Sequence, residues 1–166
     1  MSDIRAESFS RVSARSWSTV RQRIVEIERD VFGQDAFSPD ELRRAFTGRE
    51  TLAVLLWDGP GDAPGDALLV GYTQAQLASD ADTFYISNTA IAKSHQGRGL
   101  IKTLMRRLYA DIRAAGGRFI ERDVAIANGY ADMLMRVHAA DILETFDHDS
   151  EYGPQRFIRM RVPEPM

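Results

Sequence analysis

The chain has 166 residues, of which 44% are hydrophobic and 27% charged, and its formal net charge at pH 7 is -3. This length and mixture predict one globular domain over residues 1–166, and the mild acidity argues against nucleic acid or a membrane surface as partner. The lack of cysteine excludes disulfides, thiolate metal sites and a cysteine nucleophile. A polar N-terminus and the lack of a long apolar run predict a cytoplasmic protein.

Helical and strand patterns follow one another along the chain. Val20, Ile24 and Ile27 recur at helical spacing and predict a helix over 18–32. Ser38, followed by a proline and then Glu41, forms a capping box that opens a second, short helix. Later helices are expected from 100 to the glycine pair at 116–117 and over 130–139, and an exposed hairpin loop over 58–66. Strands are expected at 4–12, 51–57, 67–77, 83–92, 118–126, 142–148 and 155–162.

Strict alternation along the strand 83–92 assigns its side chains to two faces. One face carries Phe84, Ile86, Asn88 and Ala90, and the opposite face carries Tyr85, Ser87, Thr89 and Ile91. Trp17 and Trp57 are interpreted as packing residues.

The segment 90–105 combines a small-residue strand, a tight loop with glycines at 97 and 99, and an amphipathic helix. Glycine permits backbone conformations and close approaches that other residues avoid. The loop and the helix start aim several N–H groups and the positive end of a helix dipole at one point. The segment therefore predicts a phosphate-binding site.

The run from Gln96 to Ile101 resembles the acyl-CoA-binding motif of the GCN5-related N-acetyltransferase (GNAT) superfamily, Arg/Gln-x-x-Gly-x-Gly/Ala. Gln96 and Gly99 match, whereas the sixth position is Ile101 and not glycine or alanine. The order of expected elements resembles the same superfamily along nearly the whole chain. The resemblance implies an α/β fold with a mixed, mainly antiparallel sheet of about seven strands, splayed in the middle and flanked by about four helices.

The resemblance also implies acetyl-CoA, or another short acyl-CoA, as co-substrate, with no metal. Amides of 97–101 would hold the pyrophosphate with added charge from Arg98, and backbone groups of 90–92 would pair with the pantetheine arm. The amide of Ile91 would stabilise the tetrahedral oxyanion. The residues implied to bind the cofactor are Ala90, Ile91, Ala92, Gln96, Gly97, Arg98, Gly99, Leu100, Ile101, Asn128 and Met135.

A second segment resembles the superfamily's Asn-x-x-Ala-x-x-Leu-Tyr pattern, with matches at Asn128 and at the following alanine and leucine. Asn128 is also expected to cap a helix. The final tyrosine, which typically protonates the departing sulfur in the family, is Met135, and a thioether donates no proton. A thiol has a pKa of about 8.5, so it can leave as thiolate. Tyr130 and His138 are the nearest alternative donors, although a structural role is favoured for each.

Asp123 lies five residues before Asn128, where the branch that acetylates protein N-termini carries its general base in a Leu-Glu-Val-Arg-x-x-Asn run. The resemblance implies that Asp123 accepts the amine proton through water. A solvated or salt-bridged strand carboxylate is the alternative, and Glu121 on the same face is a lesser candidate. Tyr85, Ser87 and Thr89 are expected to line the acceptor pocket or to position water.

Two further clusters are interpreted as structural. Residues 147–151 (Asp-His-Asp-Ser-Glu) include metal-ligand types, but a solvated turn between the last two strands is expected there. His95, in the cofactor loop, is expected to be exposed.

The predicted reaction is direct transfer of an acetyl group from acetyl-CoA to a primary amine, on a small molecule or a protein N-terminus, with no covalent enzyme intermediate. Two alternatives stay open. One is an acyl-CoA-binding module or sensor with weak transfer activity, motivated by Met135 and by the lack of a glutamate on the strand 83–92. The other is an interaction domain with an empty cleft. A homodimer is also left open.

Overall fold

The computed structural model describes residues 3–9, 17–60, 67–78 and 80–165. The helices are α1 (Trp17–Phe32), α2 (Pro39–Thr47), α3 (Leu100–Ala114) and α4 (Tyr130–Val137), with 3-10 turns at Gly33–Asp35 and Lys93–His95. The strands are β1 (Ile4–Ser8), β2 (Thr51–Asp58), β3 (Leu68–Leu77), β4 (Thr83–Ile91), β5 (Phe119–Ala125), β6 (Ile142–Ser150) and β7 (Gly153–Arg161). Parts of the expected first strand (10–12) and of the expected hairpin loop (61–66) lie outside the described residues.

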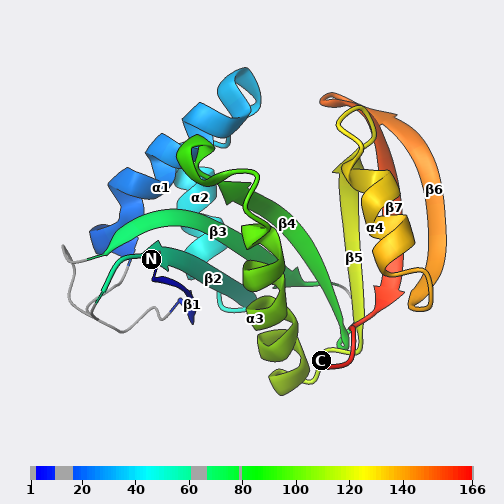
Figure 1. Cartoon of the computed structure of the whole chain (residues 1–166). Helices are drawn as coiled ribbons and strands as arrows, with labels where there is room; N and C mark the ends of the chain where they lie inside the picture. Colours follow the sequence, from blue (N-terminus) through cyan, green and yellow to red (C-terminus); the bar gives the residue numbers. More distant parts are fainter. Residues whose placement is uncertain (1–2, 10–16, 61–66, 79, 166) are drawn as a thin grey trace.

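The strands form one seven-stranded sheet in the order β1-β2-β3-β4-β5-β7-β6. Every neighbouring pair is antiparallel except β4 and β5, which are parallel. Helices α1 and α2 pack on β2, β3 and β4, α3 covers the opposite face of β1 to β3, and α4 packs on β5 (Figure 1). The predicted mixed, mainly antiparallel sheet with four helices is confirmed.

The sheet opens between its two central strands. β4 and β5 pair only from Thr83 to Tyr85, opposite 119–121, and then diverge in the V visible in Figure 1. The Ala92 amide donates to Val70 in β3 at 2.8 Å. Because successive amides of a strand point to opposite edges, the N–H groups of Thr89 and Ile91 point to the other edge, toward the opening.

A β-bulge in β4 overturns the predicted alternation. Asn88 pairs with Gln74 and Ile86 with Ala75, so the ladder skips the residue between them. Phe84 lies against the end of α3, where a Cβ on Gly117 would come within 2.9 Å of its ring. Asn88 instead donates to Glu28 of α1 at 2.9 Å. The two side chains therefore lie on opposite faces, because the extra residue reverses the alternation.

Glu28 joins α1 to the sheet beside this bulge. Its carboxylate is 1% exposed and accepts hydrogen bonds from the Tyr72 hydroxyl, from Asn88 and from the Phe37 amide. Burial, with the nearby carboxylate as a smaller cause, raises the pKa of Tyr72 far above its ordinary value. A buried carboxylate is stable when several donors satisfy it, so Glu28 fixes α1 against the bulged part of β4.

Local sequence signals position α2 as expected. The Ser38 hydroxyl accepts from the Glu41 amide at 3.2 Å, and the Glu41 carboxylate accepts from the Ser38 amide at 2.7 Å. Trp17 packs against Phe46 with ring centroids 5.4 Å apart, and Trp57 is buried. The predicted capping box and the packing roles of both tryptophans are confirmed.

Candidate active site

The glycine loop lies beside the opening, between the end of β4 and the start of α3. Gly97 and Gly99 have φ values of 80° and 72°, which only glycine adopts readily. A Cβ built on either residue would meet nothing within 4 Å. The backbone therefore faces open space at the positive end of α3, a geometry that fits a phosphate group.

Side chains hold this loop against the sheet. Gln96 donates from Nε2 to the Ile91 carbonyl at 2.9 Å. His95 bonds Asp58 of β2 through Nε2 and Ser94 through Nδ1, each at 2.7 Å. The expectation of an exposed His95 is wrong: the residue is 8% exposed, because the 3-10 turn before the loop folds it back onto β2.

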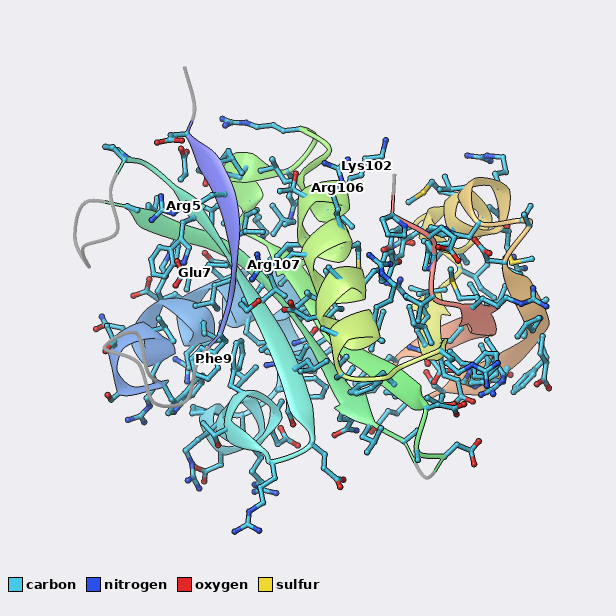
Figure 2. All side chains as sticks on the ribbon, turned by 90° about the horizontal axis from the view of Figure 1, so that it is seen from below. Arg5, Glu7, Phe9, Lys102, Arg106 and Arg107 are labelled. Carbon is cyan, nitrogen blue, oxygen red and sulfur yellow. The ribbon has the colours of Figure 1, made fainter. Side chains whose placement is uncertain are left out.

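Positive charge extends from the loop along α3. Arg98, Lys102 and Arg106 are exposed and follow at steps of four, which places the latter two along one side of the helix. Figure 2 shows Lys102 and Arg106 on the outer surface of α3, while Arg107 turns toward β1 and donates to Ser8 at 2.8 Å. The glycine motif predicts a role for Arg98 alone, but the four-residue spacing of Lys102 and Arg106 after it is visible in the sequence.

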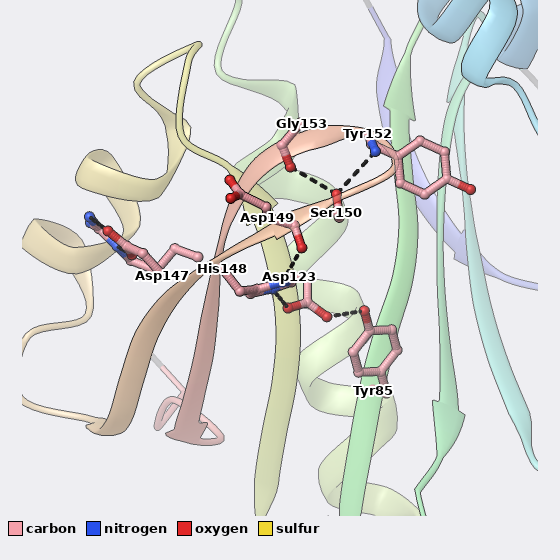
Figure 3. Close-up of polar contacts among 9 residues, drawn as sticks. Tyr85, Asp123, Asp147, His148, Asp149, Ser150, Tyr152 and Gly153 are labelled. Atoms are coloured by element: carbon pink, nitrogen blue, oxygen red, sulfur yellow. Dashed lines mark hydrogen bonds and ion pairs between the residues drawn. The ribbon is translucent and has the colours of Figure 1, made fainter.

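Asp123 lies at the centre of a polar chain that crosses the opening (Figure 3). The Tyr85 hydroxyl of β4 donates to Asp123 Oδ2 at 2.6 Å, and His148 Nε2 of β6 lies 2.7 Å from Asp123 Oδ1. Burial, and then the bond to the carboxylate, raises the pKa of Tyr85. The hydrogen bond to Asp123 raises the pKa of His148. The structure thus joins the predicted Asp123 and Tyr85, and adds His148.

The expected solvated turn over 147–151 is also wrong. β6 continues to Ser150, whose hydroxyl bonds the Gly153 carbonyl at 2.9 Å and closes a tight hairpin. Asp147 pairs with Arg156 at 2.6 Å, whereas His148 turns to Asp123. Alternation along an extended strand separates these neighbours, so the segment does not converge on one point. The described residues contain no group of three or more potential metal ligands.

Glu121, the lesser candidate, is occupied elsewhere. Its carboxylate accepts from Arg159 of β7 at 2.6 Å. A separate surface hollow of about 320 Å³ lies between β1, β2 and the C-terminal half of α3, and none of the site residues predicted from the sequence lines it.

Comparison with known proteins agrees with this geometry. The sequence model of the acetyltransferase (GNAT) family matches residues 18–138. The chain belongs to this family. The resemblance inferred from the glycine motif, and the expectation of an acetyltransferase, are confirmed. No curated protein matches the chain.

Solved GNAT structures share the fold at low sequence identity. A spermidine N-acetyltransferase SpeG chimera from Vibrio cholerae and hSSAT is 16% identical, with a TM-score of 0.68, over 96% of this chain and 95% of its own. The ribosomal-protein-S18-alanine N-acetyltransferase of Escherichia coli is 18% identical, with a TM-score of 0.67, over 100% and 96%. An aminoglycoside 6'-N-acetyltransferase complexed with coenzyme A is 13% identical, with a TM-score of 0.67, over 97% and 99%.

The second GNAT segment forms the start of α4. Asn128 accepts from the Tyr130 amide through Oδ1 at 3.0 Å, while Gly129 occupies the N-cap position. The expectation that Asn128 is the N-cap residue is therefore wrong: Gly129 holds that position, and Asn128 accepts from the first helical amide from one residue further out. Met135, on the same helix, is partly buried against the core.

Among the described helices, none combines the length and apolarity needed to span a bilayer.

A buried arginine lies under α4. Arg122 of β5 is 3% exposed and donates from Nη2 to the Tyr130 hydroxyl at 3.0 Å. Its Nε and Nη1 atoms have no hydrogen-bond partner among the described residues. Burial, and then the charge of Arg122, lowers the pKa of His138. This side of β5 therefore contains a buried cation with two donor atoms that lack a partner among the described residues, near a histidine whose pKa is lowered.

Proposed function

We propose that this GNAT protein transfers an acetyl group from acetyl-CoA to a primary amine by direct attack in a ternary complex. The observation that carries the proposal is the position of the glycine loop beside the open edge of β4. Amides of 97–101 would bind the pyrophosphate, with charge from Arg98, Lys102 and Arg106. Backbone groups of 90–92 would pair with the pantetheine arm as an added strand.

Backbone amides on the open edge of β4 would polarise the thioester carbonyl for attack. Bound acetyl-CoA supplies a thioester carbonyl, and the amides of Ile91 and Thr89 point toward the opening where that oxygen would develop negative charge. Preorganised amides of this kind lower the barrier without reorganising during the reaction. Holding the thioester and the amine together contributes further by proximity.

The amine reaches the thioester from the side that carries Asp123. Because neighbouring residues of a strand point to opposite faces, Asp123 lies across β5 from Arg122 and α4. We place the removal of the amine proton on the Tyr85–Asp123–His148 chain. Both oxygens of Asp123 accept hydrogen bonds, which argues against the solvated form of the alternative, whereas its salt-bridged form is compatible with the contact to His148.

Departure of the sulfur needs no tyrosine. Met135 donates no proton, and burial lowers the pKa of His138, which disfavours its protonated, acidic form. A thiol with a pKa of about 8.5 leaves as thiolate. The positive charge of Arg122, buried on the face of β5 where α4 packs, would stabilise this anion by electrostatic attraction.

Primary amines of small molecules and protein N-termini are both retained as acceptor classes. The solved structures of similar fold include enzymes named for spermidine, for the alanine of a ribosomal protein and for aminoglycosides. Because the sequence identities to these enzymes are low, their names support an amine as the acceptor but do not select one amine.

The deciding experiment measures thiol release from acetyl-CoA with spermidine, a peptide with N-terminal alanine, and an aminoglycoside, beside calorimetric binding of acetyl-CoA. We expect binding, and release that depends on one acceptor class. Binding without release from any acceptor would support the acyl-CoA-binding module instead. If acetyl-CoA does not bind, the interaction-domain alternative replaces the proposal.

A further inference from the structure

The geometry points to His148 as the catalytic base that takes the amine proton, with Asp123 as its positioning residue. The inference rests on the proposed function and changes the role that the sequence suggested for Asp123. It concerns a side chain of the C-terminal hairpin, in a segment for which the sequence predicts a solvated turn.

The contact with Asp123 indicates which ring nitrogen of His148 is the proton acceptor when the ring is neutral. An ionised carboxylate only accepts hydrogen bonds, so His148 Nε2 carries the hydrogen in its 2.7 Å contact with Asp123. In the neutral ring the other nitrogen, Nδ1, then carries the lone pair. Asp123 is occupied on its second oxygen by Tyr85 at 2.6 Å. The chain therefore presents an oriented imidazole, in the manner of a carboxylate–histidine pair.

The surroundings also stabilise the protonated ring. The Asp149 carbonyl lies 3.4 Å from Nδ1, so it can accept a hydrogen bond once that nitrogen is protonated. The His148 side chain is 33% exposed, which leaves it accessible to a substrate. The groups around the ring are Tyr85 of β4, Asp123 of β5, Asp147 and Asp149 of β6, and the neutral Gln155 paired with it on β7.

The step balances with these groups alone. The amine lone pair forms the new C–N bond, and the N–H proton passes to His148 Nδ1. The C–S bond then breaks, and its electron pair leaves on sulfur as thiolate. The imidazolium afterwards returns its proton to solvent or to the released thiolate, so that the products are the amide and the thiol.

The test compares pH profiles of kcat for the wild type, His148→Gln and Asp123→Asn, with acetyl-CoA and the best acceptor of the amine panel. Activity requires the neutral ring, so the wild-type acid limb should lie above the ordinary imidazole pKa of about 6.5. His148→Gln should lower kcat about a hundredfold or more and remove that limb. Asp123→Asn should lower kcat and move the limb to lower pH, because it removes the carboxylate that favours the charged ring.

NMR titration of the ring protons gives a readout that needs no catalysis. The chain has 3 histidines, and the His148 signal is assigned by its loss in His148→Gln. Its pKa should exceed the ordinary value and fall in Asp123→Asn. The matched control, Asp147→Asn, removes a neighbouring carboxylate that is bonded to Arg156, and should shift the pKa less. In the kcat profiles, the acceptor amine has the same pKa in every assay. A difference between the profiles of two variants therefore reflects a change in the protein.

The outcomes separate this inference from the proposed function. A wild type that transfers no acetyl group overturns both. If the wild type is active but His148→Gln keeps its acid limb, or Asp123→Asn leaves the limb and the His148 pKa in place, only the present inference fails. A stably folded His148→Gln variant with wild-type kcat would likewise overturn it.

Discussion

Replacement of Gly99 with valine separates the role of the glycine loop in binding from its role in folding. Gly99 has a φ of 72°, and a Cβ there would meet nothing within 4 Å. A β-branched residue in this conformation costs about 1–3 kcal/mol of backbone strain. Since no atom is displaced, this strain is the whole expected cost in stability. For a domain of this size, each kcal/mol lowers Tm by about 2–4 °C.

Acetyl-CoA affinity should fall by more than this strain explains. The valine side chain would project into the space assigned to the pyrophosphate and disturb hydrogen bonds to a charged group. Each such bond contributes about 1.5–3 kcal/mol, or roughly a tenfold to hundredfold change in Kd. Calorimetry measures Kd, and thermal unfolding with far-UV circular dichroism measures the fold.

Gly116 offers a matched control at the other end of α3. It has a φ of 88° and nothing within 4 Å of a built Cβ, so Gly116→Val should carry similar strain. We expect a similar fall in Tm but unchanged acetyl-CoA affinity. An unchanged Kd in Gly99→Val, or an equal loss in Gly116→Val, would refute the assignment of the loop.

Three further substitutions test the leaving group, the buried arginine and the cap of α2 separately. Met135→Tyr should leave kcat unchanged or raise it by restoring a proton donor near the sulfur, and a lower kcat in thiol release at unchanged Tm would contradict this. Arg122→Met should lower kcat at least tenfold. Its Tm should stay the same or rise, because the substitution removes a buried cation with two unpartnered donors. A fall in Tm with unchanged kcat would show that the role of Arg122 is structural. Ser38→Ala should cost about 1 kcal/mol of unfolding free energy in denaturant titration, by loss of the helix cap, with acetyl-CoA affinity unaltered; an unchanged free energy would argue against the capping box.

Local spacing determined the parts of this protein that depend on neighbours along the chain. The capping box at Ser38, the glycine loop before α3 and the amphipathic faces of α1 and α3 follow from backbone geometry within a few residues. Asp123 was placed beside the opening by its distance from Asn128 in a family pattern. These features need no knowledge of which strands are neighbours.

Only the tertiary structure decided what meets Asp123. His148 is 25 positions away in sequence, and it reaches Asp123 because β7 inserts between β5 and β6 in a particular register. A shift of one residue would turn His148 to the other face, and periodicity alone does not encode such a register. The bulge in β4 and the burial of His95 against Asp58 have the same origin. Each depends on contacts between segments that are distant in sequence. The free energy gained from these contacts exceeds the local conformational preference of either segment.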